Sequence, residues 1–130
     1  MDGARSALRV PGVERVYLVY RRTEQELPAD REEFDQARRE GAAFLPLLAP
    51  DRFTKAGILV CRKMTLGNPG PDGRRVPVPS EETVDIPVDS VISAIGEEAD
   101  DRILSEIGIE TLPSGRVKTK PGSFATSMER

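Results

Sequence analysis

The sequence contains no histidine, no tryptophan and only one cysteine, Cys61, among its 130 residues. Without histidine, the chain lacks the most versatile general acid and base and the usual base partner of a serine or cysteine nucleophile. This composition argues against a hydrolase. A single cysteine can form no disulfide within the chain and no zinc or iron–sulfur site built from cysteines, so we expect metal-free chemistry.

Long apolar runs and a strong charge of one sign are also missing. The segment from Met1 to Arg9 has no run long enough for a signal peptide or a membrane span, which predicts no membrane association and a cytoplasmic location. The 19 basic and 22 acidic residues leave a net charge of −3, which predicts no nucleic-acid partner. The pairs Arg38-Arg39 and Arg74-Arg75 lack interleaved aromatic residues and are interpreted as solvated faces.

The first 50 residues carry alternating signals for helices and buried strands. Helical spacing predicts a short helix within residues 2–10, which ends at Pro11-Gly12. An unbroken apolar run predicts a strand at 16–20 that is covered on both faces, as is typical of parallel sheets. A helix over 31–40 is predicted from Asp30 as its cap and Gly41 as its terminator, followed by a second buried strand near 43–48.

The pattern changes after Gly57. Residues 58–64, 74–78 and 83–86 read as short antiparallel strands, with a turn at 68–73, and together they predict a β-meander over 56–88. Val91 to Gly96 is a third candidate for a buried strand, and Asp100 or Asp101 is predicted to cap a brief helix through Ile107.

Several segments resemble one family of flavoproteins. Val19 to Thr23, followed by Glu26 to Ala29, is similar to V-Y-R-R-T-x-x-E-M-P-A in the pyridine-nucleotide domain of the glutamate synthase small-subunit family. Other matches occur in the family's order along nearly the whole chain. Residues 1–5 look like the family's M-D-x-A-R, which follows a Gly-rich loop, and residues 124–127 look like the stretch before its FAD-contacting G-D motif.

The resemblance implies an α/β fold. We expect a truncated Rossmann-like three-layer domain that lacks the first strand and the Gly-rich loop and carries an inserted antiparallel β-meander. Residues 1–130 would then form a single partial NAD(P)-binding domain. Its parts would be a βα-type part at 1–50, the meander at 56–88, a closing strand and short helix at 90–111, and a return to the FAD domain at 112–130.

The resemblance also implies a function. The parent protein would pass electrons from NADPH through FAD to iron–sulfur centres or to a partner subunit of the glutamate synthase type. This chain would be inactive alone, would bind NADPH weakly or not at all, and would leave FAD to the rest of the flavoprotein. The alternative is a non-catalytic structural or assembly module that self-associates, for example as a homodimer.

Arg21 and Arg22 are the first candidates for cofactor binding, because they follow the strand whose end distinguishes NADP from NAD in a Rossmann unit. An arginine fork matches a 2′-phosphate in geometry and charge, whereas an acidic residue would accept from the ribose hydroxyls. The alternative is two solvated arginines at a strand end.

A second group, Ala94, Ile95 and Gly96, is expected near the nicotinamide, because a glycine that closes a buried strand lets backbone lie against a ligand. An ordinary turn glycine is the alternative. The chain departs from the family's A-I-G-Q here, with Glu97 in the last position. No catalytic side chain and no metal ligand are predicted, because Asp30 and its acidic neighbours suit a helix cap and first turn. Cys61 is interpreted as a core or sheet residue.

Overall fold

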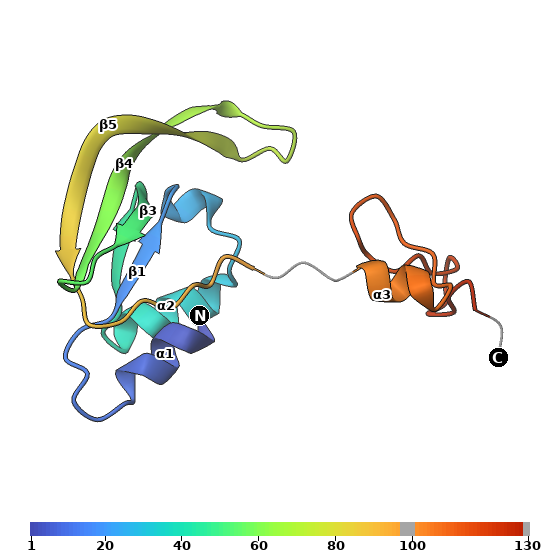
Figure 1. Ribbon diagram of the computed structural model, residues 1–130, viewed down its shortest axis with the longest axis horizontal. Helices are drawn as coiled ribbons and strands as arrows, with labels where there is room; N and C mark the ends of the chain where they lie inside the picture. The colour runs from blue at the N-terminus through green and yellow to red at the C-terminus, as the bar shows by residue number, and fades with distance from the viewer. Residues whose placement is uncertain (97–100, 129–130) are drawn as a thin grey trace. The chain divides into compact units, whose positions relative to one another are not determined.

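The computed structural model describes residues 1–96 and 101–128 (Figure 1). The protein is α/β, with one parallel and one antiparallel sheet. It divides into two compact units, Met1–Ser93 and Ala94–Arg130. The four-part division of residues 1–130 within a single domain stays a prediction.

A parallel strand pair is the middle layer of the first unit. β1 (Tyr17–Tyr20) pairs with β2 (Ala43–Pro46), so that Tyr17 lies opposite Ala43 and Tyr20 opposite Pro46. α2 (Arg31–Arg39) lies on the connection between them, because parallel strands need a crossover of about a dozen residues or more. The predicted strand, helix and strand over the first 50 residues are confirmed.

Local signals set the ends of α2. The Oδ1 atom of Asp30 accepts hydrogen bonds from the backbone N–H groups of Glu32 at 2.8 Å and Glu33 at 3.2 Å, which confirms the predicted cap. After the helix, Gly41 has a φ of +111°, a conformation that favours glycine. The chain therefore leaves the helix at this residue and enters β2.

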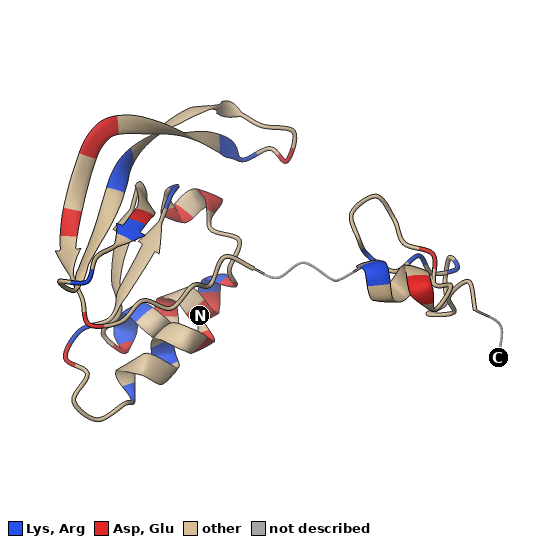
Figure 2. Ribbon diagram, in the orientation of Figure 1, with Lys and Arg blue, Asp and Glu red and all other residues tan. Residues whose placement is uncertain are grey.

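Ion pairs hold α1 (Asp2–Leu8) against the C-terminal end of α2. Glu40 accepts from Nε and Nη2 of Arg5 at 2.9 and 2.5 Å, and from Arg9 Nη2 at 3.2 Å. The Arg5 guanidinium holds the pKa of Glu40 below its usual value. Acidic and basic segments accordingly lie close together on these two helices in Figure 2.

The antiparallel sheet consists of β3 (Leu48–Phe53), β4 (Ile58–Pro69) and β5 (Arg75–Pro87), in that order. A strand at the position of β3 was not predicted. It begins after Leu47, whose φ of +56° turns the chain out of the parallel pair. Leu47 donates its N–H to the Arg22 carbonyl at 3.1 Å, and its own carbonyl accepts from the Met64 N–H at 2.8 Å.

β4 and β5 form one long hairpin, whereas the sequence predicted three short strands. The two predicted segments 74–78 and 83–86 belong to a single strand. Arg62 pairs with Thr83 and Met64 pairs with Pro79, so the register shift between these pairs accommodates residues 80–82 without ending the strand. Ser80 lies in this shift and donates its hydroxyl to the Lys63 carbonyl at 3.0 Å. The polar, proline-containing stretch is therefore an irregular part of the ladder and not a break.

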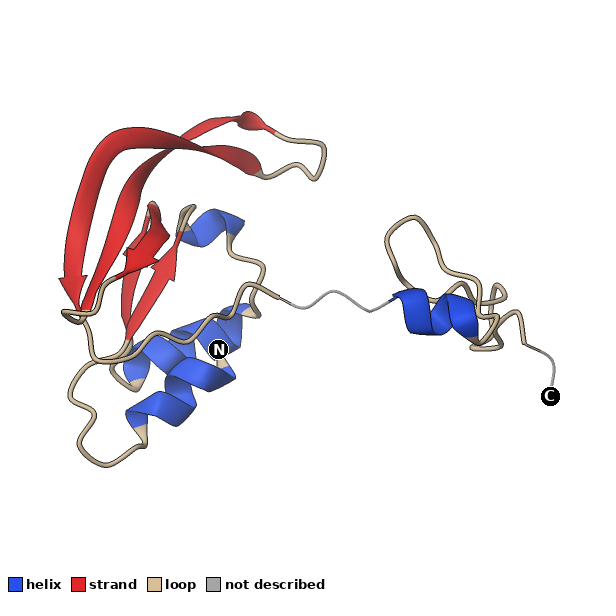
Figure 3. Cartoon of the chain, viewed as in Figure 1, coloured by secondary structure: helices blue, strands red, loops and turns tan. Residues whose placement is uncertain are grey.

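The parallel pair is covered on both faces, by α1 and α2 on one side and by the antiparallel sheet on the other (Figure 3). On the helix side, the rings of Phe34 and Phe44 meet edge to face with centroids 5.0 Å apart. On the other side, the buried residues Leu59, Cys61 and Ile86 pack against partly buried side chains. These include Tyr17, Val19, Leu45, Leu48, Val84 and Val88.

The second unit is small and has little apolar burial among its described residues. It contains α3 (Asp101–Glu106), whose predicted alternative cap Asp100 lies outside the described residues. A bridge joins Thr111 to Val117, and the hydroxyl of Ser127 donates to the Gly108 carbonyl at 3.1 Å. Phe124 is 99% exposed. In the described parts of both units, no helix has the length and apolar character to cross a membrane.

The prediction of a buried strand at Val91 to Gly96 is wrong for this structure. None of these residues is in a strand, and Ile95 is 94% exposed. A strand needs a neighbour to complete its backbone hydrogen bonds, and no described segment pairs with 91–96. An apolar run shows that residues are suited to burial, but it does not supply the neighbouring strand.

Replacing Phe34 with alanine tests the helix-side core. Phe34 is 1% exposed, so the substitution should lower the free energy of unfolding by about 3 to 5 kcal/mol, through lost burial and the cavity left behind. Urea denaturation of the chain measures the change. Arg39→Ala on the exposed face of the same helix is the control and should shift stability by no more than about 0.5 kcal/mol. Equal effects of the two substitutions would contradict this account of the core.

Candidate functional site

The candidate site lies at the carboxyl end of β1, which is where open α/β sheets bind their ligands. Arg21 and Arg22 follow the strand directly, and the short 3-10 helix η1 (Glu24–Glu26) comes next. An open pocket of about 430 Å³ adjoins this segment. It is lined by Thr23, Glu24, Gln25, Glu26, Leu66 and Arg75.

Hydrogen bonds hold η1 in a fixed place at this corner. The Oε2 atom of Glu26 accepts from the Thr23 N–H at 3.1 Å and from its hydroxyl at 2.5 Å. The Thr23 hydroxyl is also the main reason that the pKa of Glu26 lies below its usual range. In addition, the Tyr20 hydroxyl donates to the Glu26 carbonyl at 2.8 Å. The end of β1 and the turn after it are thus tied together.

The carboxylates of the corner already have partners. Glu26 is bound to Thr23, and Glu24 forms ion pairs with Arg31 and Arg38 of α2. Arg31 and Arg38 balance the negative charge of Glu24, whereas the neutral Thr23 leaves Glu26 charged, with the Arg75 guanidinium near enough to act on it. The corner can therefore accept an anionic group in spite of its two glutamates.

The two predicted arginines differ sharply in environment. Arg21 is exposed, and its side chain has no hydrogen bond or ion pair with any described residue. Arg22 is only 8% exposed, and its Nε donates to the Arg75 carbonyl at 2.7 Å, across 53 residues of sequence. No carboxylate of the described residues lies within ion-pair distance of Arg22, but the Asp72 carboxylate is near enough to interact with it electrostatically.

The two Nη groups of Arg22 are not completely buried, although the residue as a whole is only 8% exposed. Its two Nη groups make no hydrogen bond with described residues, yet no buried side-chain nitrogen or oxygen among those residues lacks a partner. The Nη edge therefore keeps some access to solvent. A guanidinium that is held at Nε and free at both Nη groups is a pre-oriented donor for an anion.

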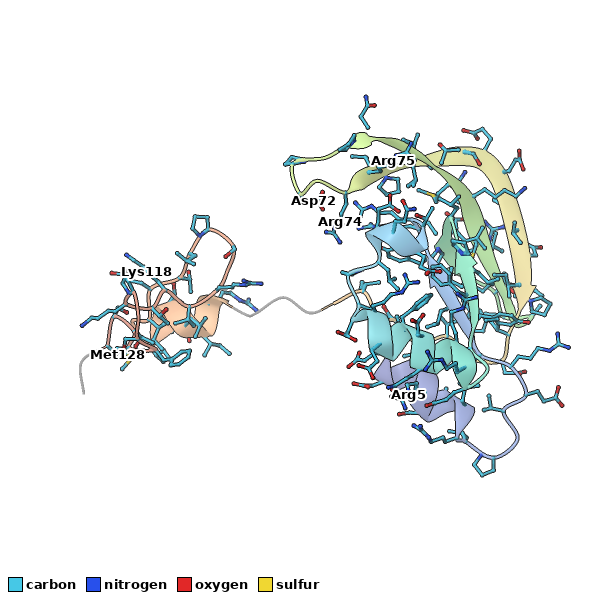
Figure 4. The ribbon with its side chains drawn as sticks, turned by 180° about the vertical axis from the view of Figure 1, so that it is seen from behind. Arg5, Asp72, Arg74, Arg75, Lys118 and Met128 are labelled. Atoms are coloured by element: carbon cyan, nitrogen blue, oxygen red, sulfur yellow. The ribbon has the colours of Figure 1, made fainter. Side chains whose placement is uncertain are left out.

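The end of the β4–β5 hairpin completes the surroundings of the corner (Figure 4). Arg75 donates from Nε to the Gly67 carbonyl at 3.1 Å and from Nη2 to the Leu66 carbonyl at 2.9 Å. Arg74 instead bonds to Asp72 at 2.8 Å, and its backbone N–H helps to lower the pKa of that carboxyl. Arg75 is exposed, as predicted for a solvated face, but its hydrogen bonds across the hairpin were not predicted, since no local motif indicates them.

The second predicted group belongs to a different compact unit from the first. Ala94, Ile95 and Gly96 belong to the second compact unit, whereas Arg21 and Arg22 belong to the first. Gly96 has a φ of +95°, which suits glycine and fits either a ligand contact or an ordinary turn. Glu97, where the chain departs from the family pattern, lies outside the described residues.

The site offers binding groups and no evident catalytic acid or nucleophile. Cys61 is fully buried in the core, as predicted, and burial raises the pKa of its thiol. Among the described residues, no three or more carboxylate or cysteine side chains gather as a metal site would require. The chemistry that these groups support is the recognition of an anion by guanidinium groups.

Sequence comparison places the chain among oxidoreductase subunits. It is 40% identical over 134 residues to the NADP(+)-dependent formate dehydrogenase subunit beta of Moorella thermoacetica, which covers 98% of the chain. It is 38% identical over 133 residues to the NADPH glutamate synthase small chain of Halomonas elongata, which covers 96%. The chain belongs to the glutamate synthase small-subunit family. The resemblance seen in its motifs is thereby confirmed.

A third relative, and the lengths of all three, define how far the likeness extends. YgfK of Escherichia coli, which is named as an oxidoreductase, is 51% identical over 109 residues, or 84% of the chain. The chain spans 11% of YgfK, 18% of the formate dehydrogenase subunit and 28% of the glutamate synthase small chain. No protein-family model matches the chain.

Two substitutions at Arg22 test its bond to the hairpin. Arg22→Gln and Arg22→Met both remove the charge, but only glutamine places an N–H donor near the position of Nε. We expect Arg22→Met to be less stable than Arg22→Gln by about 1 kcal/mol, because the Arg75 carbonyl loses its donor. Urea denaturation measures the difference. The same two substitutions at exposed Arg21 serve as the control pair and should be indistinguishable, and equal stabilities at position 22 would refute the assigned bond.

Proposed function

We propose that this chain contributes the NADPH-recognition part of a flavin-dependent oxidoreductase subunit. The observation that carries the proposal is the arginine pair at the end of β1, in which Arg22 is pre-oriented and Arg21 is free. In a Rossmann unit, this position lies beside the adenosine ribose. Two arginines there favour NADPH, whose ribose carries a 2′-phosphate, over NADH.

The relatives support the nucleotide and the redox class. The names of the formate dehydrogenase subunit and the glutamate synthase small chain specify NADP(+) and NADPH for those proteins. The fold supports the same proposal, since a parallel strand pair with a helical crossover is the core of a partial Rossmann-like domain. In this proposal the antiparallel sheet β3-β4-β5 is an insertion in a Rossmann-like domain whose first strand and Gly-rich loop lie elsewhere in a longer polypeptide.

Within the whole subunit, this chain would bind and orient the cofactor. NADPH would supply a hydride to FAD held by the rest of the polypeptide, and the electrons would continue to iron–sulfur centres or a partner subunit of glutamate synthase type. Arg21 and Arg22 would hold the 2′-phosphate. Ala94 to Gly96 would lie against the nicotinamide, with backbone and no side-chain acid near the reacting atoms. The cofactors carry the chemistry, and these residues provide position and electrostatics.

The arginine pair predicts a measurable preference. In the complete oxidoreductase polypeptide, Arg21→Gln and Arg22→Gln should each weaken NADPH binding by about tenfold to a hundredfold, because each removes a charge-assisted contact with the phosphate. Binding of NADH, which lacks that phosphate, should change by less than about threefold. Fluorescence titration with both nucleotides measures the ratio. Arg39→Gln, on α2, is the control, and an unchanged ratio in both test variants would contradict the proposal.

A second candidate is a structural or assembly module that self-associates. Two observations favour it. β1 and β2 pair only with each other among the described strands, which leaves an open edge on each strand. The second unit exposes large apolar side chains such as Phe124.

The isolated 130-residue chain separates the two candidates. The cofactor proposal predicts a monomer in light scattering and weak or no NADPH binding in calorimetry, because the pyrophosphate cradle of a Rossmann domain is its Gly-rich loop. A stable dimer would favour the module. Tight stoichiometric binding of NADPH would overturn the view that the isolated chain is an incomplete binding site.

A further inference from the structure

We propose that Arg75 is a positioning residue for NADPH recognition. Its side chain closes the irregular end of the β4–β5 hairpin, and its carbonyl fixes the Arg22 guanidinium so that the Nη edge is held ready for the adenosine 2′-phosphate. This inference rests on the proposed function and adds to it a second structural element, the hairpin. NADPH preference would then depend on a residue outside the strand end that carries the two phosphate-binding arginines.

The orientation of Arg22 comes from one hydrogen bond. Its Nε donates to the Arg75 carbonyl at 2.7 Å, and the residue is 8% exposed. Because the guanidinium is planar, a bond at Nε leaves the two Nη groups as the donors available to a ligand. An arginine that is ordered before binding loses less conformational entropy when the anion arrives. The position of the Arg75 carbonyl therefore matters for affinity.

The position of that carbonyl depends in turn on the Arg75 side chain. The β4–β5 register shifts between Leu66, which pairs with Pro77, and Pro69, which pairs with Arg75. Pro69 and Pro77 have no backbone N–H, so the ladder lacks hydrogen-bond donors at this register shift. The Arg75 guanidinium replaces them by donating to the Leu66 carbonyl at 2.9 Å and the Gly67 carbonyl at 3.1 Å. Loss of the side chain would loosen the hairpin where it holds Arg22.

Arg74 provides a matched control. It carries the same charge and precedes Arg75 in the same hairpin (Figure 4). Its backbone N–H and Nε bond to Asp72, at 3.0 and 2.8 Å, within the turn itself. Replacing Arg74 removes one positive charge beside the corner and the partner of the Asp72 carboxylate, which also interacts with Arg22, but leaves the bonds to Leu66 and Gly67 in place. A difference between the two substitutions therefore reports position and not net charge.

The experiment compares Arg74→Ala and Arg75→Ala in the complete oxidoreductase polypeptide, by titration with NADPH and NADH. We expect Arg75→Ala to weaken NADPH binding by about tenfold, while NADH binding changes by less than about twofold. Arg74→Ala should change the ratio of the two affinities by less than about twofold. An equal loss for both nucleotides in Arg75→Ala would overturn the proposal, since it would indicate a merely structural role.

A double-mutant cycle separates positioning from direct contact. If Arg75 acts through Arg22, then Arg75→Ala should have no further effect on the nucleotide ratio in an Arg22→Gln background. Additive losses would mean that Arg75 touches the phosphate itself, and the proposal would be wrong. Arg75→Gln is the milder variant, in case Arg75→Ala does not fold. Arg75→Gln keeps a donor near the Gly67 carbonyl and should show an intermediate loss of NADPH affinity. A ratio of NADPH to NADH affinity equal to that of the wild type in this variant would also contradict the proposal.

The outcomes distinguish this inference from the function on which it rests. If Arg21→Gln and Arg22→Gln leave the nucleotide ratio unchanged, the NADPH proposal fails and the role of Arg75 fails with it. If Arg22→Gln abolishes the preference but Arg75→Ala behaves like Arg74→Ala, only the positioning role is overturned.

Discussion

The first unit depends on the requirement that a parallel strand pair be shielded from water on both faces. Along β2, Phe44 points to one side and Leu45 to the other, so a single covering layer would leave one set of side chains exposed. The helices cover one face, with Phe34 against Phe44, and the antiparallel sheet covers the other through Leu59, Cys61 and Ile86. The ion pairs between α1 and Glu40 hold the outer helix to this arrangement.

Features with local causes could be predicted from the sequence. The cap at Asp30, the terminator at Gly41 and the apolar runs of β1 and β2 each depend on a few neighbouring residues, and the structure has each of them. Features that depend on a partner distant in sequence could not be predicted. β3 follows from the turn at Leu47, which fits between the Arg22 carbonyl and the Met64 N–H. The strand expected at 91–96 is the opposite case, since a suitable apolar run has no described neighbour to pair with.

The candidate site also combines features that the sequence could predict with features that it could not, and the contrast lies between two adjacent residues. In the sequence, Arg21 and Arg22 are an equivalent pair at a strand end, and their type and place already suggested a phosphate ligand. The structure shows that the two arginines differ, because only Arg22 donates a hydrogen bond to a carbonyl 53 residues away in the sequence. That carbonyl belongs to Arg75, and its place is set by a bulge between Leu66 and Pro69. A register shift of this kind has no signature in a single sequence, so the difference between the two arginines could not be anticipated.

The burial of Cys61 has a consequence for the redox setting proposed for this chain. Peroxide attacks the thiolate form of cysteine, and the susceptibility of a thiol follows its exposure and its acidity. Cys61 is inaccessible and its pKa is raised, so it is protected on both counts. In the proposed setting, a flavin that passes electrons to oxygen would produce such peroxide. The only thiol of the chain is thus shielded from oxidation to sulfenic acid by the same packing that places it in the core.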